Sequence, residues 1–91
     1  MSHHSDGELT AKLADATAKV EIGALYYHYK NPTKRYRVVR LVVLEADESV
    51  AVLYQIENGS NPEFAWVRPV SSFLDQVEWE GETVPRFTRV N

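Results

Sequence analysis

All ten aromatic side chains of this 91-residue chain lie between Tyr26 and Phe87, and the first 25 residues contain none. In the aromatic-rich part, short aromatic and β-branched runs alternate with turn residues, a pattern typical of antiparallel strands. A chain of this length buries only somewhat over ~60% of its unfolded surface. We therefore expect one small β-domain, and the length excludes an eight-fold βα barrel or a dinucleotide-binding sheet.

The turn and strand signals predict a specific order of short elements. Strands are expected over 25–29, 36–44, 50–57, 64–67, 77–79 and 85–90. Turns are expected at 30–34, 45–49, 58–62 and 80–82. A single helical turn at 71–74, with Phe73 pointing inward, follows a strand that ends at Pro69, as at the end of SH3-like barrels. The predicted fold is therefore mainly β, a small SH3-like antiparallel barrel with an added N-terminal helix.

The aromatic-free start of the chain predicts an amphipathic helix over 5–20. Its apolar residues recur with helical spacing on one face: Leu9, Leu13, Ala16 and Val20. A helix this short is marginal alone in water, so it needs a surface to pack on. The run 41–44 is apolar on both faces of its strand, and we expect the helix to cover its outer face. The alternative is an exposed patch that forms a dimer. The predicted division is 1–22, a leader and helix packed on the barrel, and 23–91, the SH3-like barrel domain.

Charge and cysteine content exclude several functional classes. The net charge is −3 at pH 7, which argues against a dedicated nucleic-acid binder. Residues 28–44 carry five basic side chains and no acid, whereas 45–82 carry nine acids against Arg68. Either these charges neutralise each other across neighbouring strands, or one basic face meets an anion. The chain has no cysteine, which excludes a disulfide framework and a thiol nucleophile. With no membrane-length apolar run and no secretory signal pattern, we expect a cytoplasmic protein that does not contact membranes.

Three short clusters place aromatic residues beside cationic ones: 26–30 (YYHYK), 66–69 (WVRP) and 84–87 (VPRF). Further characteristic segments are 36–38 (YRV), 53–55 (LYQ), Phe73 and 77–81. In this order and spacing, they resemble the small bacterial family called domain of unknown function 1653, over about residues 23 to 90. The chain departs from the pattern at Leu53, where the family has Val, and in a longer turn after Lys30. The resemblance implies a compact all-β domain and supplies no activity.

The candidate ligand-binding residues come from these clusters and from strand 50–57: Tyr26, His28, Lys30, Tyr54, Trp66, Arg68 and Arg86. The aromatic members form either a binding groove, as exposed aromatic residues do in SH3-like barrels, or ordinary core. The two arginines adjoin prolines. They either grip a carboxylate or phosphate together, or each pairs with an acid such as Asp75 or Glu78. We expect His28, Trp66 and both arginines to lie on or near one surface.

His28 is the histidine that we expect to be ordered, since His3 and His4 belong to the leader. Its pKa range suits general acid–base catalysis. No nucleophile or metal-ligand spacing accompanies it, so we expect no metal and no cofactor, and a structural role is favoured. The expected function is a non-enzymatic binding module that recognises a peptide or small anionic ligand through an aromatic-basic surface, as a monomer or weak homodimer. The alternatives are a nucleic-acid-associated accessory domain and a small enzyme centred on His28.

Overall fold

The computed structural model describes residues 6–57 and 64–90. Its helical elements are α1 (Asp6–Lys19) and the single turn α2 (Val70–Phe73). Its strands are β1 (Leu25–His28), β2 (Asn31–Val43), β3 (Val50–Ile56), β4 (Trp66–Pro69), β5 (Gln76–Trp79), β6 (Glu82–Pro85) and β7 (Phe87–Arg89). The predicted mainly β fold with an N-terminal helix is therefore confirmed. The expected leader with His3 and His4 and the expected turn at 58–62 lie outside the described residues.

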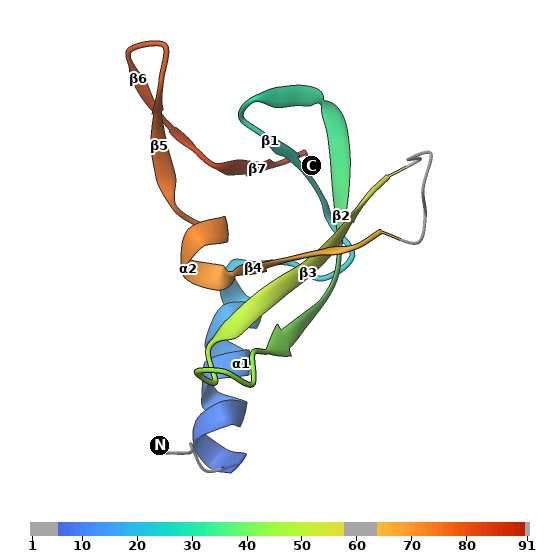
Figure 1. Cartoon of the computed structure of the whole chain (residues 1–91), viewed down its shortest axis with the longest axis vertical. Helices are drawn as coiled ribbons and strands as arrows, with labels where there is room; N and C mark the ends of the chain where they lie inside the picture. The colour runs from blue at the N-terminus through green and yellow to red at the C-terminus, as the bar shows by residue number, and fades with distance from the viewer. Residues whose placement is uncertain (1–5, 58–63, 91) are drawn as a thin grey trace.

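Antiparallel pairing joins five strands into one curved sheet of order β4-β3-β2-β1-β7 (Figure 1). Strands β5 and β6 form a separate two-stranded hairpin that projects from the sheet (Figure 1). The order of β4, one helical turn and β5 agrees with the expected SH3-like arrangement. The barrel is nevertheless open, because β4 and β7 are the two edges of the five-stranded sheet and do not pair with each other.

Several strand boundaries differ from those predicted. Strand β2 begins at Asn31, which pairs with His28, so the turn before it contains only two residues. The next paired residues are Tyr26 and Tyr36, so β2 advances by five residues while β1 changes by two. The extra residues form a bulge in β2. This bulge accommodates Pro32, whose missing N–H a regular ladder would not tolerate. Strand β4 begins two residues later than expected, and the expected last strand over 85–90 is divided between β6 and β7.

A second bulge, at Val39, determines which β2 side chains reach the core. Val38 pairs with Tyr54 and Arg40 pairs with Leu53, so one extra residue stands in β2. This insertion reverses the alternation of side chains along β2. Val38 and Leu41, three residues apart, therefore face the same side of the sheet, and both are buried.

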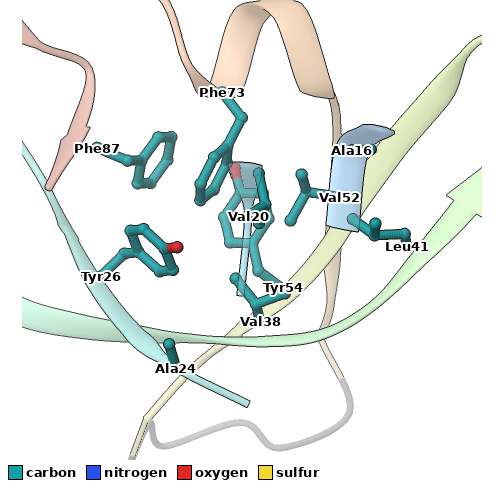
Figure 2. Packing of buried hydrophobic residues seen from close by; sticks show 10 residues of the cluster. All are labelled: Ala16, Val20, Ala24, Tyr26, Val38, Leu41, Val52, Tyr54, Phe73 and Phe87. Atoms are coloured by element: carbon teal, nitrogen blue, oxygen red, sulfur yellow. The ribbon is translucent and has the colours of Figure 1, made fainter. Parts of the chain in front are cut away.

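Helix α1 contributes to the same core as the sheet and α2 (Figure 2). The buried cluster consists of Ala16, Val20, Ala24, Tyr26, Val38, Leu41, Val52, Tyr54, Phe73 and Phe87. The expectation that α1 covers the outer face of 41–44 was wrong. The bulge in β2 turns Leu41 toward the face of Val52, so the helix fills one end of the concave side. The predicted inward position of Phe73 is confirmed, because its side chain is fully buried.

The connection from α1 to β1 is fixed against β2 by main-chain hydrogen bonds. The Gly23 N–H donates to the Val38 carbonyl at 2.8 Å, and the Val38 N–H donates to the Ala24 carbonyl at 3.0 Å. Gly23 has φ of +88°, a backbone conformation in which glycine avoids the strain of a side chain. The glycine lets the chain turn directly from the helix into the sheet.

Candidate ligand-binding site

A cavity of about 290 Å³ opens on the concave face of the five-stranded sheet. All five strands contribute to its lining, which consists of His28, Asn31, Tyr36, Tyr54, Trp66, Arg68 and Phe87. The cavity has the volume of a small ligand site, about 300 Å³ being the lower end of the usual range. We call it the aromatic cavity.

The strand register directs these side chains toward one another. Trp66 pairs with Tyr54, and Arg68 pairs with Val52, whose side chain is fully buried. Residues two apart in a strand point to the same face, so Trp66 and Arg68 both project from β4 onto the concave side. The prediction that Trp66 and Arg68 share a face of their strand is therefore confirmed.

The aromatic walls of the cavity meet mostly edge to face. Tyr54 and Trp66 are nearly parallel, with 25° between their planes and ring centres 6.3 Å apart. Tyr36 stands edge-on to both, with centre distances of 5.7 Å to Tyr54 and 6.4 Å to Trp66. Tyr54 and Phe87 are buried at the base, whereas Trp66 is 42% exposed at the rim. Tyr54 therefore belongs to the core, whereas the Trp66 side chain remains partly exposed.

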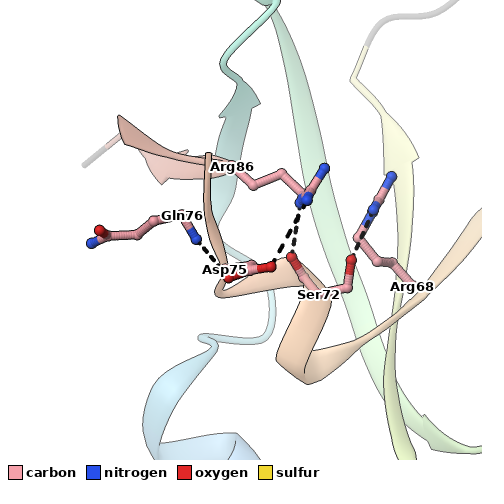
Figure 3. A network of polar contacts seen from close by, with 5 residues as sticks. All are labelled: Arg68, Ser72, Asp75, Gln76 and Arg86. Carbon is pink, nitrogen blue, oxygen red and sulfur yellow. Dashed lines mark hydrogen bonds and ion pairs between the residues drawn. The ribbon is translucent and has the colours of Figure 1, made fainter. Parts of the chain in front are cut away.

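Arg68 brings a guanidinium into this aromatic cavity. Its Nη1 donates a hydrogen bond to Ser72 Oγ at 2.9 Å (Figure 3), and its Cζ lies 5.8 Å from the centre of the Phe87 ring. Its Nε is buried and has no hydrogen-bond partner among the described residues. Within the described part of the chain, no carboxylate forms an ion pair with Arg68. A buried cationic donor without an acceptor is unusual, because such a group loses its hydration without compensation.

Arg86 approaches the same helical turn and is held outside the lining (Figure 3). Its Nε donates to the Ser72 carbonyl oxygen at 3.1 Å, and its Nη2 lies 3.9 Å from Asp75 Oδ2. This ion pair is long, and the Asp75 side chain is exposed, so it contributes little to stability. The two arginines therefore meet at Ser72, and a carboxylate partner of the kind considered from the sequence is found for Arg86.

His28 supplies a neutral edge to the cavity. Its Nδ1 accepts a hydrogen bond from the Lys30 N–H at 3.2 Å, so a neutral ring carries its proton on Nε2. Partial burial lowers the pKa of His28 below its ordinary value of 6.5. The positive charges of Arg68, Arg86 and Lys30 lower this pKa further. The site is therefore electropositive and presents hydrogen-bond donors.

Three of the seven predicted site residues do not line the aromatic cavity: Arg86, Tyr26 and Lys30. Tyr26 is buried in the core, where its hydroxyl accepts the Glu21 N–H at 3.2 Å. Lys30 is exposed, with its ammonium 5.8 Å above the Tyr29 ring. The structure thus brings together four of the predicted residues: His28, Tyr54, Trp66 and Arg68.

Sequence reasoning missed three lining residues, Asn31, Tyr36 and Phe87. Asn31 was assigned to a turn, and its pairing with His28 depends on a bulge with no clear sequence signal. Tyr36 stood in the characteristic segment 36–38, and Phe87 stood in the aromatic-cationic cluster 84–87. For Tyr36 the available signal was its spacing from Val38, because residues two apart in a strand face the same side.

The basic stretch of β2 is partly neutralised by its neighbours. Arg37 Nη2 forms an ion pair with Oε2 of Glu57, the residue that directly follows β3. The Arg35 guanidinium lies 5.7 Å from the centre of the Tyr27 ring. Across residues 6–57 and 64–90, no three His, Asp or Glu side chains cluster as metal ligands would. In the same ranges, no helix has the length and apolar character needed to cross a bilayer.

Comparison with known proteins assigns the part of the chain that forms the cavity to a protein family. No curated protein and no solved structure matched the chain significantly. A family profile matched residues 24–89, a segment that begins after α1 and contains every residue lining the aromatic cavity. The chain therefore belongs to the family described as "Protein of unknown function (DUF1653)".

Proposed function

We propose that this protein is a non-enzymatic binding module that holds the carboxylate or phosphate group of a peptide or small ligand in the aromatic cavity. The observation that carries the proposal is the buried Nε of Arg68, which has no acceptor. Among the residues that the structure describes, no acid lines the cavity, so an incoming anion meets donors without competition from a carboxylate of this part of the chain.

The energetics favour an anionic ligand. Leaving a buried donor unsatisfied costs about 1–3 kcal/mol, and this cost is recovered when the Arg68 side chain moves to bring Nε against an anion in the cavity. A planar guanidinium binds carboxylate and phosphate oxygens through charge-assisted hydrogen bonds. Beside Arg68, the faces and edges of Tyr36, Tyr54 and Trp66 offer apolar contact for the rest of the ligand. A ligand that combines an anion with an apolar or aromatic group fits both features.

The surroundings of His28 support binding rather than catalysis. Its Nδ1 is occupied by a main-chain N–H, and no carboxylate in the described ranges orients the ring as a general base requires. The nucleic-acid alternative draws support from the stacking surface of Trp66 beside Arg68. It is weakened by the net charge of −3 and by the pairing of Arg37 with Glu57.

Titration of the ¹⁵N-labelled protein with benzoate and with phenyl phosphate tests the proposal. We expect amide shifts confined to the lining of the cavity and a rise in the pKa of His28, because a bound anion favours the imidazolium. Arg68→Met keeps a long side chain against Phe87 and should weaken binding at least tenfold, since a charge-assisted hydrogen bond contributes about 1.5–3 kcal/mol.

The matched control is Arg40→Met, since Arg40 is exposed on β2 opposite Leu53 and does not line the cavity. This control should bind both anions as the unaltered protein does. Equal losses of anion affinity in the two variants would show that binding depends on the overall charge of the protein and not on Arg68 in particular. If neither benzoate nor phenyl phosphate binds at millimolar concentration, the proposed function is refuted. Tighter binding of single-stranded oligonucleotides, with a steep dependence on salt, would favour the nucleic-acid alternative.

A further inference from the structure

The aromatic cavity lies between two strand edges that no other strand occupies. Strand β4 pairs only with β3, and β7 pairs only with β1, among the strands that the structure describes. Trp66 and Arg68 line the cavity from β4, and Phe87 lines it from β7. The gap that leaves the barrel open therefore coincides with the candidate binding site. A free strand edge exposes main-chain donors and acceptors that pair readily with an added strand.

We propose that the ligand is an extended acidic peptide that adds as an antiparallel strand along the free edge of β4 and places a Glu or Asp side chain beside Arg68. This inference rests on the proposed function, because it assigns the anion of the cavity to a peptide side chain. Main-chain hydrogen bonds along an edge give such complexes affinity, and side-chain pockets give them specificity.

The register of β4 specifies the peptide sequence that fits. A strand added to a sheet lies about 4.8 Å away, and its alternate side chains point to one face. Trp66 and Arg68 both project to the concave face, so two peptide side chains, two residues apart, project beside them. Antiparallel addition reverses the direction, so the peptide residue opposite Arg68 precedes the one opposite Trp66. The matching motif is an acidic residue, any residue, then an aromatic or large aliphatic residue.

Charge and exposure along the edge agree with this occupant. Arg68 carries the donor without an acceptor, and neutral His28 shares the lining with it. Trp66 is 42% exposed and Val67 is 48% exposed, so both side chains are partly open to solvent, each on its own face of β4. Pro69 ends the strand and lacks an N–H, which limits the edge to a short segment. A short edge supplies few main-chain bonds, so the acidic and aromatic side chains decide the affinity.

The experiment uses a blocked heptapeptide, acetyl-Thr-Thr-Glu-Thr-Phe-Thr-Thr-amide, and the full chain carrying Trp79→Phe. This substitution leaves Trp66 as the single tryptophan, because the chain has two, and Trp79 does not line the cavity. Trp66 fluorescence then reports binding. We expect the peptide to bind at least tenfold more tightly than benzoate, and the peptide with Gln in place of Glu to bind at least tenfold more weakly. Arg68→Met should abolish the difference between the Glu and Gln peptides.

Two further peptides test the strand pairing itself. One is N-methylated at the Glu and the other at the following Thr, which removes one main-chain N–H in each and leaves the side chains unchanged. Alternate amides of an added strand face its neighbour, so one of the two methylations should weaken binding at least tenfold. If both methylated peptides bind as tightly as the parent peptide, the edge addition is overturned.

The failure of this inference can be separated from failure of the proposed function. If benzoate binds in a manner that depends on Arg68 but the heptapeptide binds no more tightly, the strand addition is wrong and the anion site stands. If neither probe binds, both are wrong. If oligothymidylate binds more tightly than the heptapeptide and competes with it, the peptide is not the ligand and the inference is overturned.

Discussion

Replacing Val20 by alanine measures how far α1 belongs to the core of the domain. Val20 is fully buried, and its side chain lies among those of Val52, Tyr54 and Phe73 (Figure 2). Removal of two methyl groups forfeits about 1.6 kcal/mol at roughly 0.8 kcal/mol per buried carbon. The cavity left behind raises the expected loss to about 2–3 kcal/mol. Val20 follows the last residue of α1, so the higher helix propensity of alanine offsets little of this loss.

Urea unfolding followed by circular dichroism gives the free energy of unfolding for both proteins. A domain of this size has a total stability of about 5–14 kcal/mol, so the loss is a large fraction of it. The melting temperature should fall by roughly 10–20 °C. The control is Val39→Ala, because Val39 is 40% exposed in the β2 bulge and should lose under about 1 kcal/mol. A loss below about 0.5 kcal/mol in Val20→Ala would refute the packing of α1 into the core.

Three further substitutions test particular local features. Gly23→Ala should cost about 1–2 kcal/mol in thermal or urea unfolding, mainly from the positive φ, because among the described residues no atom beyond the neighbouring residues lies within 4 Å of the added Cβ. Tyr26→Phe should cost about 0.5–1.5 kcal/mol by the same measurement, since it removes the acceptor of the Glu21 N–H. The lowered pKa of His28 means that the unfolded chain binds more protons just below pH 6.5, so stability falls as the pH falls through this range. His28→Asn should show a smaller fall in melting temperature between pH 7.5 and 5.5, and an identical fall would contradict this linkage.

Strong local patterns made most of the fold predictable. The helical spacing of Leu9, Leu13, Ala16 and Val20 predicted α1, and the alternation in 50–56 predicted β3. Phe73 was correctly expected to point inward from a single helical turn. These features depend on residues close in sequence, whose periodicity reports the buried face directly.

Register and closure were the features that local patterns could not supply. The bulge at Val39 rotates Leu41 to the concave face, and nothing in the run of β-branched residues marks the extra position. The helix was therefore assigned to the wrong face of the sheet. The open gap between β4 and β7 also depends on long-range geometry, because the arrangement of the whole sheet decides whether these two edge strands pair with each other.

The candidate site was predictable to the extent that cavity-lining residues gather in short clusters. His28, Trp66 and Arg68 were selected because aromatic and cationic residues adjoin there, and all three line the aromatic cavity. Arg86 was selected for the same reason, but its guanidinium turns to a main-chain carbonyl of α2. Its hydrogen-bond acceptor is a backbone atom, which residue types in a sequence do not identify, whereas its ion-pair partner Asp75 was considered from the sequence.

Ser72 distinguishes the roles of the two arginines, since Arg68 bonds to its hydroxyl and Arg86 bonds to its main-chain carbonyl (Figure 3). Ser72→Ala removes only the first acceptor, so Arg86 keeps its contact while the Arg68 guanidinium loses the bond that orients it. The partly buried Arg68 bond contributes about 0.5–1.5 kcal/mol, so we expect a loss of stability within this range. If Arg68 holds the anion, benzoate should bind roughly 3–10-fold more weakly, because a freely rotating guanidinium pays more entropy on binding. Arg86→Met should leave the fold intact and benzoate affinity within about twofold, as expected of a side chain outside the lining. The same loss of benzoate affinity in Arg86→Met as in Ser72→Ala would show that the cavity depends on the positive charge of both arginines rather than on the orientation of Arg68.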